Sequence, residues 1–357
     1  MSTAARPTRI GVVGCGTIAY WTHLRALARL PDAKLVAAAD PDPAARARAQ
    51  RLSRIEVHEH ADELLARDDV DAVLLCPATP AHAAVALAAC RQRIPFYLEK
   101  PLAISADESR AILAAAAAAR IVAAVGFNRR QHPLNQRARA LLAAGRIGRV
   151  RTVLTAYCEP AAADTLPDWK RSRASGGGAL LDLGSHHIDL VRWLLDDEIV
   201  TVEARLESDA SEDDSAWLRL ATRGGVEVRS AFSMRSGPTD WLSFIGERGT
   251  LLIDRFRCAL EVRAARRFGY GQRRVHLLPR PGNAGWRLER AVRPSHDPSY
   301  VRALAAFVAE VRGAPALTAR LADGARSLAV VLAAEESARL GRAVEIDPTS
   351  DADPARD

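Results

Sequence analysis

Three side chains that can hold or move a proton recur at helical spacing near the middle of the sequence. Asp182, His186 and Asp189 stand at positions i, i+4 and i+7, which share one face of an α-helix. Their neighbours are mostly apolar, so burying these groups is costly unless they are paired or functional. Histidine exchanges a proton near neutral pH, and a nearby carboxylate fixes its tautomer. The cluster is therefore a candidate for proton transfer, and His186 shares the face of Asp182, whereas His187 points about 100° away around the helix.

Two other interpretations of this cluster stay open. The imidazole and the carboxylates could be a satisfied structural set inside a packed helix. A metal site built from Asp182, His186 or His187 is the second alternative, although the spacing offers no evident third ligand. We expect no metal.

A lysine at the end of a predicted strand is a second candidate for chemistry. The chain has 47 arginines but lysine only at Lys34, Lys100 and Lys170. Lysine differs from arginine in offering a compact donor with a tunable pKa. Lys100 follows Glu99 and precedes Pro101, which disfavours helical dihedrals for Lys100. Open α/β sheets bind ligands at the ends of such strands, so we predict Lys100 as a catalytic residue; an ordinary solvated lysine is the alternative.

A glycine motif near the start of the sequence predicts a dinucleotide site. Gly14, Gly16 and Ala19 form G-x-G-x-x-A between a predicted strand, 9–13, and a predicted helix, 17–30. The first glycine permits the turn, the second lets a pyrophosphate approach the backbone, and the small third residue lets helix and sheet pack closely. The helix N-terminus adds free N–H groups and a positive dipole end.

A carboxylate at the end of the second predicted strand completes the dinucleotide motif. Asp40 lies where it can accept hydrogen bonds from ribose hydroxyls. Its charge favours NAD over NADP, with Arg46 and Arg48 as possible partners of a 2′-phosphate. Asp40 followed by Pro41 is also a good start for a helix, so Asp40 could cap that helix in addition or instead.

These residues require a scaffold whose first part alternates strands and helices. Helices separate the predicted strands, which cover 9–13, 34–39, 55–57, 72–76, 95–98 and 121–125. This order indicates βαβ units, hence a doubly wound parallel sheet. After about residue 148, alternating runs surround a helix over 180–195 and predict an α+β domain on an open, mostly antiparallel sheet. We expect a dinucleotide-binding domain at 1–126, a second domain at 127–347 that ends with helices over 299–312 and 321–340, and a flexible tail at 348–357.

Composition and charge exclude several classes of protein. The 357 residues carry a net charge of +7, which suggests a nucleic-acid partner. Arginine and alanine are abundant throughout, however, and no nucleic-acid-binding module is recognised. We attribute the charge to compositional bias, although arginines in 255–274 could meet a substrate phosphate or carboxylate. No apolar run suits a membrane span or signal peptide, and five scattered cysteines favour a reducing, cytoplasmic setting.

Taken together, these motifs resemble the Gfo/Idh/MocA family of oxidoreductases. The resemblance rests on Asp40 and on segments that follow in order, GVVGCGTIA (11–19), CPATPAH (76–82), EKPLA (99–103), GFNRR (126–130) and GGGALLDLGSHHIDLVRWLL (176–195). Two later segments, FIGERGTLLI (244–253) and EESARLGRAVEI (335–346), also fit, whereas 255–295 match nothing that we can assign. The doubled histidine at 186–187 departs from the family pattern.

The resemblance implies a Rossmann domain, an α+β domain whose sheet mediates a homo-oligomer (dimer or tetramer), and a nicotinamide cofactor between the two. It implies hydride transfer at a secondary alcohol of a sugar, cyclitol or sugar derivative. Lys100 would contact substrate and cofactor, and Asp182 and His186 would be the family's proton-transfer pair, with Asp189 supporting them. Arg129 is a further expected substrate contact. Additional cofactor contacts are expected at Thr17, Ile18, Pro77, Thr79, Pro80, His82, Glu99, Asn128, Trp169 and Lys170.

Two other activities fit the same scaffold. One is NAD-dependent glycoside hydrolysis through transient oxidation of the sugar. The other is a non-catalytic, nucleotide-binding regulator. The presence of Lys100, Asp182 and His186 together argues against a regulator, because a protein that only binds needs no proton shuttle.

Overall fold

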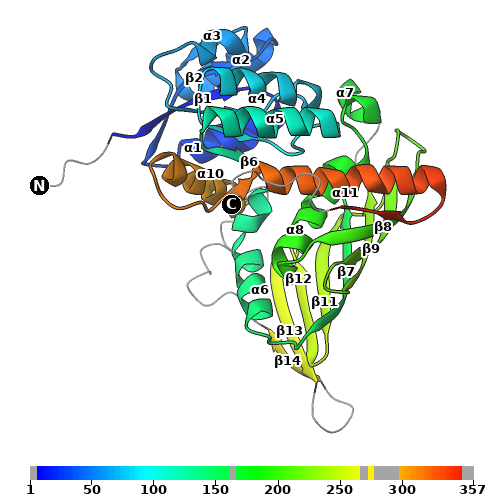
Figure 1. Cartoon of the computed structure of the whole chain (residues 1–357). Coiled ribbons are helices and arrows are strands. Elements are labelled where there is room, and N and C mark those ends of the chain that lie inside the picture. Colours follow the sequence, from blue (N-terminus) through cyan, green and yellow to red (C-terminus); the bar gives the residue numbers. More distant parts are fainter. Residues whose placement is uncertain (1–5, 161–165, 266–271, 277–296, 348–357) are drawn as a thin grey trace, which may run out of the picture. The chain divides into compact units, whose positions relative to one another are not determined.

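The computed structural model describes residues 6–160, 166–265, 272–276 and 297–347, and the chain divides into two units (Figure 1). Unit 1 contains residues 1–128 and 299–328, and unit 2 contains residues 129–298 and 329–350. The sequence pattern places 299–328 in the predicted second domain, whereas in the structure these residues belong to unit 1. The predicted tail, 348–357, lies outside the described residues.

Unit 1 is built on a seven-stranded sheet in the order β15-β6-β5-β4-β1-β2-β3. Its strands are β1 (Thr8–Val13), β2 (Ala33–Ala39), β3 (Glu56–His58), β4 (Ala72–Leu75), β5 (Phe96–Leu98), β6 (Ala123–Val125) and β15 (Ala319–Arg320). Strands β1 to β6 pair in parallel, which confirms the predicted doubly wound sheet. Strand β15 pairs antiparallel with β6. Its two residues are too few to show a periodicity, so the sequence pattern does not reveal this strand.

The helices of unit 1 connect these strands and complete its core. They are α1 (Leu24–Leu27), α2 (Pro43–Ser53), α3 (Ala61–Leu65), α4 (His82–Arg91), α5 (Ala106–Ala119) and α10 (Pro298–Val311). Leu304 and Phe307 of α10 are fully buried in one cluster with Ile10, Val12 and Leu74 of the sheet. Helix α11 (Leu321–Leu340) belongs to unit 1 as far as Leu328 and to unit 2 beyond it.

The helix predicted over 17–30 is shorter and differently wound. A π-helical turn, η1 (Ala19–His23), precedes the single α turn of α1. This correction matters because η1 places His23 inside the core, where it is fully buried.

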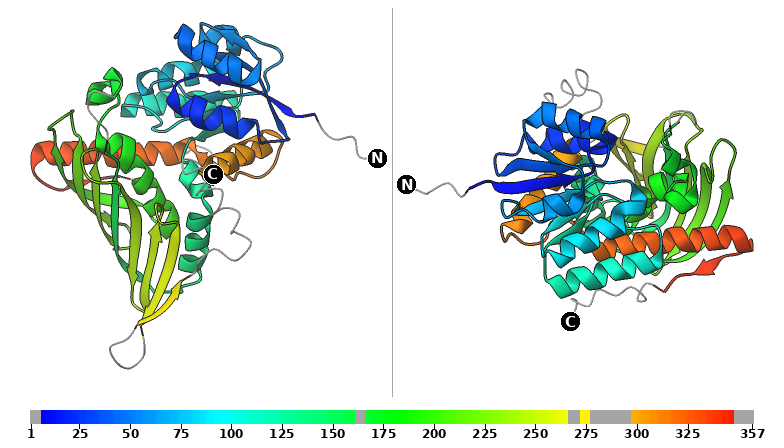
Figure 2. Two further views of the ribbon diagram at one scale, coloured as in Figure 1. Left: turned by 180° about the vertical axis from the view of Figure 1, so that it is seen from behind. Right: turned by 90° about the horizontal axis from the view of Figure 1, so that it is seen from above.

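Unit 2 contains a nine-stranded sheet in the order β14-β13-β12-β11-β7-β10-β9-β8-β16. Figure 2 shows the ribbon of this sheet from two further sides. Its strands are β7 (Val150–Cys158), β8 (Ile199–Glu207), β9 (Ser215–Thr222), β10 (Glu227–Ser233), β11 (Thr239–Gly246), β12 (Gly249–Asp254), β13 (Ala259–Ala265), β14 (Gln272–His276) and β16 (Val344–Glu345). Only the β7–β10 pair of this sheet is parallel among the described strands. The predicted open, mostly antiparallel sheet is therefore confirmed.

One face of this sheet is packed against helices. Helix α6 (Pro133–Ala143) contacts β12 and β13, and α8 (Ser185–Leu195) contacts β7. Along β9, buried Leu218 and Leu220 alternate with exposed Trp217 and Arg219, as expected for a sheet with one covered face. The sequence pattern does not predict α6, because its polar and arginine residues hide the apolar stripe.

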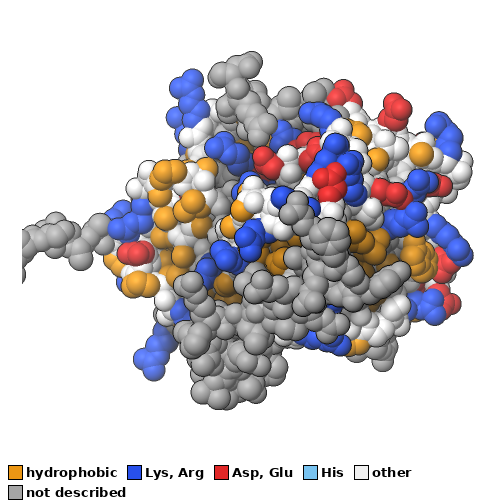
Figure 3. Space-filling view, turned by 90° about the horizontal axis from the view of Figure 1, so that it is seen from below, with side chains coloured by type: hydrophobic (Ala, Val, Ile, Leu, Met, Phe, Trp, Pro, Cys, Tyr) orange, Lys and Arg blue, Asp and Glu red, His pale blue; other side chains and the backbone are white. Residues whose placement is uncertain are grey.

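On one face of the molecule, side chains of both charge signs are intermixed (Figure 3). On the face drawn in Figure 3, Lys and Arg side chains are scattered among Asp, Glu and hydrophobic ones. This distribution fits a compositional origin of the positive charge. In the described part of the chain, no helix has both the length and the apolar character needed to cross a bilayer.

Candidate active site

The glycine loop of unit 1 has the backbone that its motif requires. Gly14 has φ of +88°, and a Cβ at this position would stand 2.4 Å from the carbonyl oxygen of Cys76. A side chain is therefore excluded, because the loop lies directly on the chain that follows β4. A Cβ at Gly16, in contrast, would meet no atom within 4 Å. The backbone of Gly16 faces open space, which fits the close approach of a phosphate group.

The Asp40 carboxylate holds this loop in place. Its Oδ2 accepts a hydrogen bond from the backbone N–H of Cys15 at 2.6 Å, and its Oδ1 accepts one from Asp42 N–H at 2.8 Å. Helix α2 is capped by Asp42, whose carboxylate accepts from the second and third N–H groups after it, and Pro43 is the first helical residue. The helix-cap alternative for Asp40 is therefore wrong by two residues.

The two arginines considered for a 2′-phosphate also have protein partners. Arg46 donates to the backbone carbonyl oxygen of Asp40 at 2.7 Å and to that of Pro41 at 3.0 Å. Arg48 lies 3.9 Å from a carboxylate oxygen of Asp42. Arg46 and Arg48 are thus engaged with the protein, and the Asp40 carboxylate beside the loop would repel a 2′-phosphate. Both observations favour a cofactor with a free 2′-hydroxyl.

The residues around Lys100 are held by buried side chains. Glu99 Oε1 lies 2.6 Å from His23 Nε2, and Glu99 Oε2 accepts the backbone N–H of Lys100 at 3.2 Å. Burial is the largest single effect and opposes the Glu99 charge, but the hydrogen bond from His23 and the nearby charges of His23, Lys100 and His82 together outweigh it, so the pKa of Glu99 is lowered. On the other side, His82 Nδ1 lies 2.7 Å from the carbonyl oxygen of Pro101. Burial lowers the pKa of His82, which keeps this imidazole neutral.

The remaining cofactor candidates of unit 1 line the ends of the parallel strands. Pro77 follows β4, and the turn η2 (Thr79–Ala81) begins with buried Thr79 and then Pro80. Thr17 and Ile18 follow the open Gly16 and lead into η1. Asn128 is buried and donates from Nδ2 to Ser299 Oγ at 2.7 Å. Together with Asp40 and the glycine loop, this set suits a dinucleotide.

In unit 2, Asp182 is brought together with Lys170. The Lys170 ammonium lies 2.7 Å from Asp182 Oδ2 and 5.4 Å from the ring centre of Trp169. Lys170 belongs to α7 (Asp168–Arg171), and Asp182 belongs to the π-helical turn η5 (Leu180–Gly184) that precedes α8. The expectation of one continuous α-helix through Asp182 is therefore corrected.

Gly177 allows the segment that carries Lys170 to close on its own chain. A Cβ at Gly177 would stand 2.2 Å from the carbonyl oxygen of Lys170 and 2.9 Å from that of Ser172. No side chain fits there, so a glycine at 177 is required for the close approach of this loop to its own backbone.

The adjacent histidines have different surroundings. His186 has 8% of its surface exposed, and His187 has 1%. His187 Nε2 lies 3.1 Å from Asp240 Oδ1, and its ring is stacked on that of Tyr157 at 5.5 Å. Burial lowers the pKa of His187 despite the Asp240 carboxylate. His187 is therefore a neutral packing residue, and His186 is the more accessible of the two.

Arg129, an expected substrate contact, lies in the same buried network. Its guanidinium is 3.1 Å from Asp240 Oδ2 and 4.2 Å from the centre of the Tyr157 ring. Arg255 also contacts Asp240 Oδ2, at 2.6 Å, and reaches Asp297 at 2.7 Å. Arg255 therefore serves this network, whereas residues 266–271 of the arginine-rich segment lie outside the described residues.

Asp189 is paired with an arginine inside unit 2. The Arg130 guanidinium donates two hydrogen bonds to the Asp189 carboxylate, at 2.9 Å and 2.5 Å. Paired in this way, the buried Asp189 charge anchors α8 to the segment before α6.

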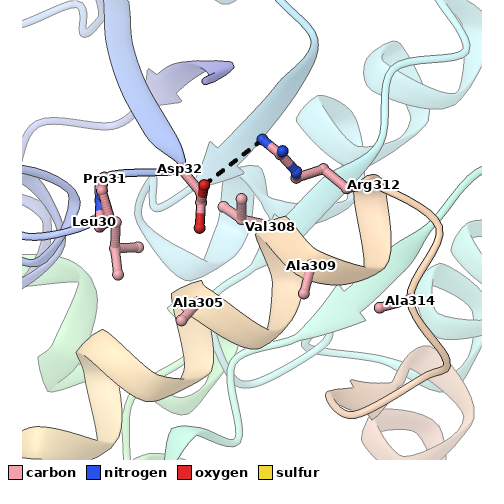
Figure 4. Close-up of a pocket in the computed structure, with 8 residues that line it drawn as sticks. All are labelled: Leu30, Pro31, Asp32, Ala305, Val308, Ala309, Arg312 and Ala314. Atoms are coloured by element: carbon pink, nitrogen blue, oxygen red, sulfur yellow. Dashed lines mark ion pairs between the residues drawn. The ribbon is translucent and has the colours of Figure 1, made fainter. Parts of the chain in front are cut away.

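A pocket of about 280 Å³ lies elsewhere on unit 1 (Figure 4). The loop at 30–32 and α10 form most of its wall, and Asp32 and Arg312 face each other across it at 4.0 Å. Its lining contains none of the predicted site residues. This pocket is mostly apolar and carries no catalytic group.

Sequence reasoning missed three contributors to these sites. His23 and Asp240 carry no individual signal, because each meets its partner only through the tertiary fold. Tyr157 resembles any strand aromatic in the sequence, yet it contacts both Arg129 and His187. The predicted order of strands could have suggested that His23 is near the site, since the helix that follows β1 packs beside the parallel sheet.

Comparisons with known proteins identify the relatives of this chain. Residues 8–127 match the model of an oxidoreductase family with an NAD-binding Rossmann fold, and residues 135–252 match the GFO/IDH/MocA C-terminal domain. Inositol 2-dehydrogenase 2 of Saccharopolyspora erythraea is 31% identical, over 95% of this chain and 96% of its own. A dTDP-3,4-didehydro-2,6-dideoxy-alpha-D-glucose 3-reductase of Streptomyces violaceoruber is 32% identical, over 87% and 86%. The crystal structure of a putative myo-inositol dehydrogenase from Sinorhizobium meliloti covers 95% of this chain and 100% of its own, with 27% identity and a TM-score of 0.78.

Proposed function

The chain belongs to the Gfo/Idh/MocA family of NAD(P)-dependent oxidoreductases, and on that premise we propose that it oxidises a secondary alcohol of a cyclitol or a related sugar. The observation that supports this activity most is in unit 2. The Lys170–Asp182 ion pair joins α7 to the turn η5, which leads into the helix of His186. Such a set suits proton transfer from a hydroxyl group.

The glycine loop, Asp40 and the strand ends of unit 1 would hold the cofactor. When bound, nicotinamide exchanges a hydride with the substrate carbon. Lys100 holds the hydroxyl oxygen and stabilises the negative charge that develops on it. His186 takes the hydroxyl proton during oxidation and returns it during reduction. Asp182, with Lys170 beside it, orients the substrate and the imidazole.

Cyclitols are the substrate class that the relatives favour. Inositol 2-dehydrogenases are among the relatives that match nearly the whole chain. The dTDP-sugar 3-reductase makes reduction of a nucleotide-linked ketosugar the second candidate. Both reactions use the same proton donor and acceptor in opposite directions.

We further propose a homo-oligomer that uses the uncovered face of the nine-stranded sheet. Trp217 is 42% exposed and Ile245 is 37% exposed on strands β9 and β11. Trp217 stands in register with Ala231, Ala231 with Ala156, and Ala156 with Trp241, so two tryptophans flank two alanines across four neighbouring strands. Exposed apolar side chains on a sheet face are typical of protein interfaces.

The decisive experiment is a spectrophotometric screen for NADH and NADPH with inositols, hexoses, sugar acids and nucleotide-linked ketosugars. We expect net NADH formation with an inositol or a related polyol. Lys100→Met and His186→Ala should each abolish this turnover while NAD binding, measured by titration, persists. Release of an aglycone from a glycoside without net NADH would identify a hydrolase instead. Cofactor binding without turnover across the screen would identify a regulator.

A further inference from the structure

We propose that His23 is a positioning residue that acts on Lys100 through Glu99. This inference rests on the proposed function, since it assumes that Lys100 holds the reacting oxygen. His23 itself follows the glycine loop in η1 and is fully buried. It acts on the reaction through another side chain rather than by touching the substrate.

Two hydrogen bonds connect His23 to the backbone of Lys100. His23 Nε2 lies 2.6 Å from Glu99 Oε1, and the other Glu99 oxygen accepts the N–H of Lys100 at 3.2 Å. A carboxylate bonded at both oxygens has little freedom to rotate. The peptide that orients the Lys100 side chain is therefore tied to the core of unit 1.

The surroundings of the pair hold both side chains in place. The His23 ring packs edge-on against Tyr97 and Tyr300, with centroids 6.1 Å and 5.6 Å away. A Cβ at Gly126 would stand 3.1 Å from both Glu99 Oε2 and the nitrogen of Lys100. The lack of a side chain at Gly126 leaves room for the Glu99–Lys100 hydrogen bond.

A second buried histidine holds the other side of Lys100. His82 Nδ1 lies 2.7 Å from the carbonyl oxygen of Pro101, the next residue along the chain. The backbone at 99–101 is thus held by His23 through Glu99 before Lys100 and by His82 directly after it. A side chain supported in this way keeps one direction, which a catalytic ammonium group requires.

The charge of Glu99 depends on His23. The titratable groups around this carboxylate are His23, Lys100, His82, Tyr97 and Cys76. The hydrogen bond from His23 is the largest effect that lowers the pKa of Glu99 against its burial. Without this donor, burial would raise the pKa of Glu99 and favour a protonated carboxyl group. A protonated carboxyl group is a weaker acceptor for the N–H of Lys100.

The test compares His23→Leu with His23→Gln and with the control Tyr97→Phe. His23→Leu removes the donor, and we expect kcat to fall about 10- to 100-fold, the range for a misplaced catalytic group. NAD affinity should stay within about threefold, because the cofactor loop is untouched. His23→Gln keeps an N–H donor for Glu99 and should restore most of kcat. Tyr97→Phe keeps the ring that packs on His23 and should behave as the wild type.

The pH profile separates positioning from simple loss of stability. In His23→Leu, kcat should fall further as the pH decreases toward 5, because loss of the His23 hydrogen bond raises the pKa of Glu99 and makes its carboxylate easier to protonate. Tyr97→Phe should keep the wild-type profile. Equal kcat and equal pH profiles for His23→Leu and the wild type would overturn the proposal.

A double-mutant cycle supplies the second test. If His23 acts through Glu99, then adding His23→Leu to Glu99→Gln should cost less than about threefold in kcat. Additive losses would overturn the proposed route. If His23→Leu does not fold, Glu99→Gln alone should lower kcat about tenfold, and wild-type kcat in that variant would contradict the proposal. The Lys100→Met result is separate, because activity in that variant would overturn the proposed function itself.

Discussion

Two adjacent histidines illustrate how much a single position decides at the residue scale. His187 is enclosed by Asp240, Tyr157 and Phe232, whereas His186 keeps some exposure. One helical step therefore separates a packing residue from a candidate proton shuttle. The departure from the family pattern, two histidines in place of one, is explained by the buried Asp240 that the second histidine meets.

This difference predicts opposite results for the two substitutions. His186→Ala should lower kcat by at least about 10²- to 10⁴-fold, the usual contribution of a general acid–base group, so that turnover is effectively abolished with little change in the unfolding midpoint. His187→Ala should instead lower the free energy of unfolding by about 2–3 kcal/mol, because it opens a cavity and leaves a buried carboxylate short of a partner. Kinetics and thermal unfolding of both purified variants provide the measurement. A large stability loss confined to His186→Ala would contradict these assignments.

The residue types predicted for the site were recoverable from the sequence because they sit in short motifs. Gly14 and Gly16 needed only the strand and helix around them, and Lys100 needed only its proline and the bias toward arginine. His23, Asp240 and Tyr157 lack such context, since their partners are 76, 53 and 30 positions away along the chain. Contacts of that range are set by strand order and packing, which a local pattern does not encode.

At the scale of elements, the cap of helix α6 and the loop before η5 can each be tested by a substitution. Helix α6 begins after His132, whose Nδ1 accepts the N–H of Leu134 at 3.2 Å. Burial lowers the pKa of His132 to about 4, with Asp297 opposing and Arg255 reinforcing this shift. The cap needs an unprotonated Nδ1, so it depends on that lowered pKa.

The pH dependence of stability follows from this cap. The unfolded chain binds a proton at His132 near its ordinary pKa of about 6.5, whereas the folded chain does so only near 4. Stability from this group is therefore present above about 6.5 and is lost as the pH falls toward 4, at up to about 1.4 kcal/mol per pH unit. His132→Asn keeps an acceptor for the cap and cannot titrate, so its unfolding free energy should depend less on pH in this window. An unchanged slope in denaturant titrations at pH 7 and pH 5 would contradict the prediction.

The loop before η5 provides a second prediction at this scale. In Gly177→Ala, the new methyl group would collide with the carbonyl oxygen of Lys170, so the segment must shift and the Lys170–Asp182 ion pair should be lost. We expect kcat/KM to fall about 10- to 100-fold. Gly237→Ala is the matched control, since a Cβ at Gly237 would meet no atom within 4 Å. Equal kinetics for the two variants would show that the Lys170 loop does not support the reaction.

The spacing of apolar residues predicts most helices and strands, but not the segments in which the helical period itself changes. Most strands of both sheets were predicted because buried and exposed residues alternate, or because short apolar runs are bounded by turns. Strands β14, β15 and β16 were not predicted. The π-helical turns η1 and η5 were not predicted, because a wider turn leaves no distinct residue pattern in so short a segment. Both wider turns occur in candidate site segments, one carrying His23 and the other carrying Asp182. Local departures from regular structure are common at functional sites.

At the scale of the whole molecule, the uncovered sheet face is the feature with the clearest consequence for assembly. Trp217→Glu and Ile245→Asp would each place a charge among apolar residues of that face. If the face is the oligomer interface, either change should shift the molecule toward the monomer in analytical ultracentrifugation, with the fold intact by circular dichroism. Arg257→Glu offers a charge change at an exposed turn after β12 and should leave the assembly unchanged. A wild-type monomer, or variants that assemble normally, would place the interface elsewhere.

The net positive charge predicts little at this scale. Many arginines of the described residues form ion pairs with neighbouring carboxylates, such as Arg67 with Asp69 and Arg192 with Glu198. Paired charges of this kind produce a weak external field. The net charge therefore reflects the composition of the chain, whereas the proposed chemistry depends on the two lysines Lys100 and Lys170.

Because residues 299–328 belong to unit 1, this unit cannot complete its fold during synthesis until those residues have been made. Strand β6 lacks its neighbour β15, and the core lacks Leu304 and Phe307, until the last sixth of the chain has left the ribosome. During that interval β6 is an open edge that can pair with other chains. A nascent chain stalled before residue 299 should therefore recruit chaperones or aggregate, even though every residue of the glycine loop has already been made.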